Sequence, residues 1–172
     1  MTALSALMTV DVAGATETLR MRGMLYYKKP GNMRIDVLGP FLIPGMHAAV
    51  ARILLAADRQ EKICIYGDYD VDGVTATAMM VEVLRALGGN AEAYIPNRFD
   101  EGYGLNNEAL DVLAERGFGV VLTVDCGIRS PREAEHARAL GLDLIISDHH
   151  MPKDELPDAL AVVCQKRDKD PY

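Results

Sequence analysis

The chain has 172 residues, of which 49% are hydrophobic and 25% are charged, and its net charge is −7. This length predicts one main domain with enough residues for a substantial core. A protein of this charge does not attract nucleic acid through a general basic field, which counts against a plain DNA-binding module. A polyanionic substrate would have to be met by local cations, or by metal ions that offset the acidic groups.

Neither a membrane span nor a signal peptide is expected in this sequence. No stretch approaches the roughly 20 apolar residues that cross a bilayer, and the opening residues 1–8 contain no basic n-region. The cysteines at 64, 126 and 164 lie far apart and lack the spacing of zinc ligands. We therefore expect reduced thiols in a cytoplasmic protein.

Residues 1–40 differ in pattern from the rest of the chain. Thr18–Tyr27 and Asn32–Leu38 show the alternation of strands, and the Lys-Lys-Pro-Gly stretch between them is typical of a turn. This pattern predicts a β-hairpin without an attached helix. We expect a boundary near residue 40, between an N-terminal segment of uncertain origin (1–40) and a second domain (41–172).

Strand and helix patterns alternate from residue 41 onward. Short apolar or β-branched runs predict strands at 62–66, 91–95, 119–124, 144–146 and 161–163. Helical spacing and capping residues predict helices at 46–57, 74–87, 106–116 and 131–140, the second buried on most sides and the last opened by a capping box at Ser130. This alternation predicts an α/β fold, a Rossmann-like parallel sheet of about five strands with helices on both faces.

Three polar clusters follow predicted strands, at 68–72, 125–127 and 148–150. In a parallel sheet all the carboxyl ends of the strands lie at one edge, where ligands bind. A single aspartate after a strand is ordinarily a helix cap or a turn residue. Three such clusters at one edge, with two histidines among them, favour a binding site instead.

The residue types in these clusters indicate a particular class of metal. Carboxylates together with neutral imidazoles suit Mn²⁺ or Mg²⁺ better than zinc, which prefers more nitrogen and sulfur. Closely spaced carboxylates repel each other unless cations lie between them. Two ions about 3.5–4 Å apart form the usual arrangement for the hydrolysis of phosphate esters.

Four motifs carry a resemblance to a known family, and they are Tyr66–Gly73, Ile95–Leu105, Thr123–Ile128 and Ser147–Pro152. They resemble the DHH phosphoesterase superfamily, named for the triplet at 148–150, and within it the RecJ-like exonucleases specific for single-stranded DNA. The resemblance covers 41–172 and does not cover 1–40. It implies a DHH phosphoesterase domain over 41–172.

The resemblance also implies a function. The leading one is metal-dependent phosphodiester hydrolysis, as a 5′-to-3′ exonuclease on single-stranded DNA in repair or recombination, with two Mn²⁺ or Mg²⁺ ions in the complete site. A small-substrate DHH phosphoesterase acting on oligonucleotides or dinucleotides is one alternative, and a non-catalytic DHH-like scaffold is another. A dinucleotide-cofactor enzyme is disfavoured, because the first strand-to-helix turn lacks the Gly-x-Gly-x-x-Gly pattern.

Position by position, the resemblance assigns metal ligands to this chain. Asp68 and Asp70 correspond to ligands of the first motif, Asp125 to a ligand that can bridge both ions, and His149 to the ligand of the third motif. His150 would face the scissile phosphate. These five residues form the expected catalytic set.

Three further residues are expected around this set. Asp148 would orient a histidine from behind the metal ligands. Asp72 either touches the metal itself or, at the start of the following helix, caps that helix or supports the site. Arg98 is either a solvated or salt-bridged loop residue or a contact to a substrate phosphate.

The family pattern includes a fourth motif with a further aspartate, and the sequence ends at Tyr172 before such a residue. We therefore expect a domain truncated before the fourth motif. Such a domain should hold metal more weakly, bind nucleic acid poorly and have impaired activity.

Overall fold

The computed structural model describes residues 4–13, 18–28, 32–38, 43–97, 104–153 and 155–166. The chain forms two compact units, residues 1–42 and 43–172. Among the described helices, none has both the length and the apolar character that crossing a bilayer demands.

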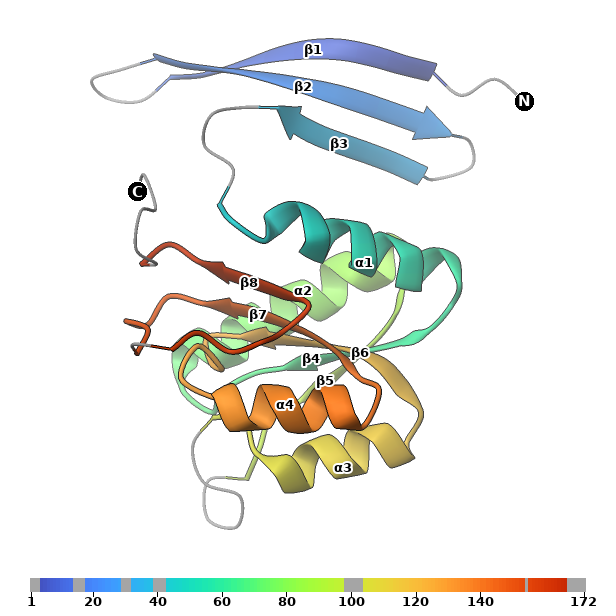
Figure 1. Cartoon of the computed structure of the whole chain (residues 1–172). Helices are drawn as coiled ribbons and strands as arrows, with labels where there is room; N and C mark the ends of the chain where they lie inside the picture. Colours follow the sequence, from blue (N-terminus) through green and yellow to red (C-terminus); the bar gives the residue numbers. More distant parts are fainter. Residues whose placement is uncertain are drawn as a thin grey trace. The chain divides into compact units, whose positions relative to one another are not determined.

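The first unit contains an antiparallel sheet of three strands in the order β1-β2-β3 (Figure 1). The strands are β1 (Leu4–Ala13), β2 (Thr18–Lys28) and β3 (Asn32–Leu38). The predicted hairpin is the β2–β3 pair, in which Tyr27 lies opposite Met33. Strand β1 was not predicted, because its Ala, Leu and Met residues have no strong preference for strands, and its pairing with β2 decides its conformation.

The second unit contains the predicted α/β fold. Its strands are β4 (Lys62–Tyr66), β5 (Asn90–Tyr94), β6 (Phe118–Val124), β7 (Asp143–Asp148) and β8 (Ala161–Cys164). Its helices are α1 (Met46–Asp58), α2 (Val71–Ala86), α3 (Asn107–Glu115) and α4 (Pro131–Ala139). All five strands are parallel, in the order β5-β4-β6-β7-β8 (Figure 1), which confirms the predicted five-stranded parallel sheet.

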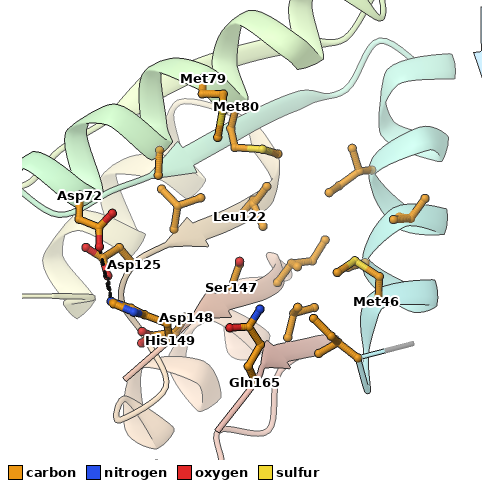
Figure 2. A pocket seen from close by; sticks show the side chains of 18 residues that line it. Met46, Asp72, Met79, Met80, Leu122, Asp125, Ser147, Asp148, His149 and Gln165 are labelled. Atoms are coloured by element: carbon orange, nitrogen blue, oxygen red, sulfur yellow. Dashed lines mark ion pairs between the residues drawn. The ribbon is translucent and has the colours of Figure 1, made fainter. Parts of the chain in front are cut away.

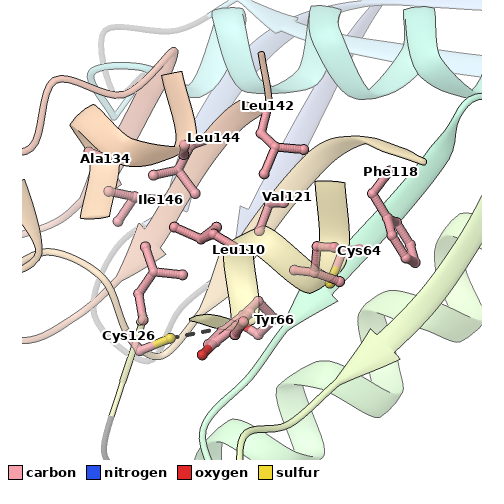
Figure 3. Close-up of a cluster of buried hydrophobic side chains, with 14 of the residues drawn as sticks. Cys64, Tyr66, Leu110, Phe118, Val121, Cys126, Ala134, Leu142, Leu144 and Ile146 are labelled. Atoms are coloured by element: carbon pink, nitrogen blue, oxygen red, sulfur yellow. Dashed lines mark hydrogen bonds between the residues drawn. The ribbon is translucent and has the colours of Figure 1, made fainter. Parts of the chain in front are cut away.

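The sheet is buried on both faces by helices. Ile63 and Ile65 of β4 belong to one apolar cluster, to which α1 and α2 contribute. Cys64 and Tyr66, which point to the opposite face, belong to a second cluster with residues of α3 and α4 (Figure 3). Strands buried on both faces are expected to be continuously apolar, which explains why these runs were recognisable in the sequence.

The caps of the helices differ in part from those predicted. Asp70 caps α2 by accepting a hydrogen bond from the Gly73 amide at 2.9 Å, so the helix begins at Val71 rather than Val74. Asn106 caps α3 in the same way. The capping box predicted at Ser130 was wrong, because the Ser130 side chain makes no capping hydrogen bond.

The expectation that α2 is buried on most sides was also wrong. One face, with Thr77, Val81 and Leu84, lies against the sheet. Val71 is 81% exposed and Met79 is 61% exposed. The helix covers β4 and β5 with a single face, so its remaining apolar side chains lie at the surface.

Candidate metal centre

The polar clusters meet at the carboxyl edge of the sheet, beside the point where the strand order reverses. Strands β4 and β6 are neighbours, and β5 and β7 lie to either side of them. Ligands of open α/β sheets bind at such a reversal. Asp68 follows β4, Asp125 follows β6 directly and His149 follows β7 directly, so the sheet brings these three residues to one place.

Asp68, Asp70 and Asp125 form one group of donors, in which one oxygen of each lies within 4.8 Å of the others. Asp68 is fully buried. Its Oδ1 accepts a hydrogen bond from the Tyr69 amide at 2.7 Å, whereas its Oδ2 is buried and has no donor among the described residues. A buried carboxylate oxygen without a donor is costly unless a cation or water binds it.

Asp125, His149 and His150 form a second group with the same spacing. His149 Nε2 lies 2.9 Å from Asp125 Oδ1 and 3.6 Å from Asp72 Oδ2 (Figure 2). The contact with Asp125 is an ion-pair approach without hydrogen-bond alignment, because Asp125 Oδ1 has no hydrogen-bond partner in the described part of the chain. Asp125 belongs to both groups and lies between them.

Asp148 anchors His150 and the neighbouring loop. Its Oδ1 lies 2.8 Å from His150 Nδ1 and accepts the His150 amide at 3.0 Å. Its Oδ2 accepts the Ile128 amide at 2.9 Å. A carboxylate that engages Nδ1 fixes the orientation of the ring and leaves Nε2 for a ligand. The Asp148 side chain thus contacts both the ring and the backbone amide of His150.

The carboxylate of Asp125 lies in an environment that disfavours its charge. Burial raises the pKa of its carboxyl group, Asp72 and Asp70 raise it further, and the two histidines counteract only part of this. Its backbone adopts φ 64°, in the left-handed region that is uncommon for residues other than glycine but is tolerated by Asp and Asn. Both the left-handed backbone and the ionised carboxylate of Asp125 are therefore unfavourable for the stability of the fold.

The donor set fits a hard divalent cation. It combines carboxylate oxygens with imidazole nitrogens, and two of its buried oxygens have no hydrogen-bond donor among the described residues. The three cysteines are buried at 64, 126 and 164 and contribute no sulfur to either donor group. Mn²⁺ and Mg²⁺ prefer such ligands.

A cavity of about 520 Å³ adjoins the cluster, between α1, α2 and the sheet. Asp72, Asp125 and His149 line it near the donor groups, and apolar side chains such as Met46 and Met80 line the rest (Figure 2). The exposed carboxylate of Asp72 therefore faces this space and does not cap α2, which is the role of Asp70.

Sequence reasoning missed two contacts that hold the segment carrying the acids against α2. A Cβ at Gly67 would lie 1.9 Å from Thr77 Oγ1, and Thr77 Oγ1 in turn donates to the Gly73 carbonyl at 2.7 Å. The glycines on both sides of the acids were the available signal, because glycine often marks a close approach of backbones. Arg98 lies outside the described residues.

Known proteins share these features. The pattern of the DHH family, N-terminal domain, matches residues 62–170. The single-stranded-DNA-specific exonuclease RecJ of Bacillus subtilis is 51% identical over 132 residues, which cover 77% of this chain and 17% of that protein. RecJ of Escherichia coli is 43% identical over 122 residues, covering 70% and 21%. The chain therefore spans about a fifth of the length of these curated relatives.

Two solved structures resemble the second unit. A crystal structure of exonuclease RecJ bound to manganese matches with a TM-score of 0.71 and 36% identity, covering 78% of this chain and 34% of that chain. RecJ in complex with Mn²⁺ from Thermus thermophilus matches with a TM-score of 0.65 and 31% identity, covering 77% and 19%. Together with the match over 62–170, these similarities show that the chain belongs to the DHH family.

Proposed function

We propose that this chain carries the metal-binding part of a phosphodiesterase that removes nucleotides from single-stranded DNA in the 5′-to-3′ direction, in DNA repair or recombination. The observation that carries the proposal is the position of Asp125, whose carboxylate belongs to both donor groups. A carboxylate shared in this way is the arrangement that holds two divalent ions over a phosphodiester. The substrate is inferred from the RecJ relatives, whose names state specificity for single-stranded DNA.

The proposed cofactor is Mn²⁺ or Mg²⁺, held by Asp68, Asp70, Asp125 and His149. When bound, the ions supply a water of lowered pKa and polarise the phosphoryl group. His150, whose Nδ1 is engaged by Asp148, offers Nε2 to a phosphate oxygen. The buried position of Asp148 keeps this imidazole in one orientation as substrate binds.

A cytoplasmic location is part of the proposal. Cys64, Cys126 and Cys164 are free thiols in the described fold, which suits a reducing compartment. All four proposed ligand positions carry metal-binding side chains, which argues against the non-catalytic scaffold.

Calorimetric titration with Mn²⁺ tests the metal site. The wild-type chain should bind, and Asp70→Asn should lower the affinity at least about tenfold, which is the lower end of the loss that removal of even a supporting residue causes. Asp111→Asn is the matched control, since Asp111 is an exposed aspartate on α3 paired with His136. Absence of Mn²⁺ binding by the wild-type chain would favour the scaffold.

The substrate is tested with oligonucleotides labelled at either end. The proposed exonuclease releases mononucleotides from the 5′ end of a single strand in the presence of Mn²⁺. Digestion of dinucleotides alone, with longer strands left intact, would support the small-substrate phosphoesterase instead.

A further inference from the structure

Arg129 occupies a defined position beside the candidate metal centre. The segments 125–129 and 148–151 run next to each other and are joined by two hydrogen bonds. Ile128 donates its amide to Asp148 Oδ2 at 2.9 Å, and Arg129 donates Nε–H to the Met151 carbonyl at 2.8 Å. The guanidinium group is thus attached to the same stretch of backbone that carries His149 and His150.

The charge of Arg129 is not neutralised by any acidic residue that the structure describes. Arg52, Arg116 and Arg138 each form ion pairs with carboxylates. Arg129 is exposed, and its contact with the Met151 carbonyl uses only Nε. Among the described residues neither terminal amino group has a hydrogen-bond partner, and together they form the planar fork that suits two oxygens of one phosphate.

A nucleic-acid strand at the carboxyl edge of the sheet would be stabilised by a positively charged group such as the Arg129 guanidinium. The chain has a net charge of −7, and the donor cluster itself is acidic, so the general field repels a polyanion. Metal ions can offset the charge only where they bind. A phosphate next to the one at the cluster therefore requires a separate positive group, and arginine binds phosphate oxygens strongly through paired hydrogen bonds.

We propose that Arg129 binds a backbone phosphate of the substrate strand adjacent to the phosphate at the metal centre. The inference rests on the proposed function, because it presumes a single-stranded substrate. In this proposal, the hydrogen bond from Nε–H to the Met151 carbonyl holds the guanidinium group in the orientation that binds the phosphate. The competing explanation is that Arg129 only ties the two segments together through its Nε–H.

The test measures binding of a fluorescent oligothymidylate with hydrolysis-resistant phosphorothioate linkages, in Mn²⁺ and over a series of KCl concentrations. Arg129→Gln should weaken binding about five- to tenfold at low salt. It should also reduce the slope of log affinity against log salt by about 0.7, the value for one phosphate contact with a single strand. Arg129→Lys, which keeps the charge and loses the Nε–H bond, should retain most of the slope.

Arg59→Gln is the matched control, because Arg59 is exposed and lies before β4, at the opposite edge of the sheet. It should leave the slope unchanged, and all variants should bind Mn²⁺ as the wild type does. An unchanged slope in Arg129→Gln, an equal loss in Arg59→Gln, or equal losses in the Gln and Lys variants of Arg129 would each overturn the inference. A wild-type chain that binds Mn²⁺ but no DNA would refute the proposed substrate, and this inference with it.

Discussion

Gly73 of α2 lies directly against the backbone of Asp68. A Cβ at position 73 would be 2.7 Å from the Asp68 amide nitrogen, from its carbonyl oxygen and from its Cβ. Backbone atoms cannot rotate away from such a clash, so an added methyl group must displace the segment that follows β4. The first turn of the helix and the buried carboxylate therefore form one rigid unit.

Gly73→Ala should lower the affinity for Mn²⁺ by about tenfold or more, because metal ligands tolerate displacements of only about 0.5 Å. Calorimetric titration measures this directly. Gly88→Ala is the control, since position 88 has positive φ but open space around it. Both variants should lose stability, and only Gly73→Ala should lose metal affinity. Equal affinities in the two variants would contradict the rigid contact.

Asp125→Asn should raise the melting temperature of the metal-free protein at pH 7. A carboxyl group whose pKa is raised on folding holds its proton more tightly in the native state, so its ionisation destabilises the fold as pH rises above the ordinary carboxyl range. Asparagine removes this charge and also tolerates the left-handed backbone. Each kcal/mol gained corresponds to about 2–4 °C in a chain of this size.

The same variant provides its own controls. As the pH falls and the wild-type carboxyl group takes up its proton, the difference in melting temperature should shrink. Added Mn²⁺ should stabilise the wild type and have little effect on Asp125→Asn. A variant that melts below the metal-free wild type at pH 7 would show that the carboxylate is not under strain.

Tyr66 and Asn106 share a buried hydrogen-bond network. The Tyr66 hydroxyl donates to the Gly104 carbonyl at 3.0 Å and accepts from Asn106 Nδ2 at 3.1 Å, while Asn106 also caps α3. Tyr66→Phe and Asn106→Ala should each cost about 1 kcal/mol. Because both remove the bond between them, the double variant should lose less than the sum, as measured by urea unfolding followed by circular dichroism. Strict additivity would mean that the two side chains are not coupled.

The buried cysteines should be unreactive in the native protein. Burial raises the pKa of the Cys64 thiol to about 12, and nearby Arg116 offsets only part of this. Burial also raises the pKa of the Cys126 thiol. The thiolate is the reactive form, so labelling with a disulfide reagent at pH 8 should be slow until guanidinium unfolds the chain, after which all three thiols react. Rapid labelling of the folded protein at Cys64 would contradict the burial.

The parts of the fold that could be predicted were those with a strong local signal. Strand β4 was predicted at its observed bounds, because an apolar run between Lys62 and Tyr66 is bounded by polar residues and glycine. The convergence of Asp68, Asp125 and His149 followed from parallel topology alone. Strand β1 lacked such a signal, since its pairing partner determines its conformation.

The details of the candidate site depended on backbone angles that sequence does not reveal. Asp70 and Asp72 are both acids at the start of a helix, and only the extended conformation of Asp70 makes it the cap. The left-handed backbone of Asp125 had no sequence signal beyond the tolerance of aspartate for it. The position of Arg129 had no local sequence signal, because its side chain is held by a carbonyl group 22 positions along the chain.

The order of the strands also bears on how the fold fluctuates. Asp68, Asp125 and His149 follow β4, β6 and β7, each of which has a paired neighbour on both sides, whereas β5 and β8 form the two borders of the sheet. Hydrogen exchange through local opening begins where the backbone is least protected. Fraying of either border strand can therefore release its amides to solvent while the three interior strands, and the carboxylates and imidazole they present, keep their spacing.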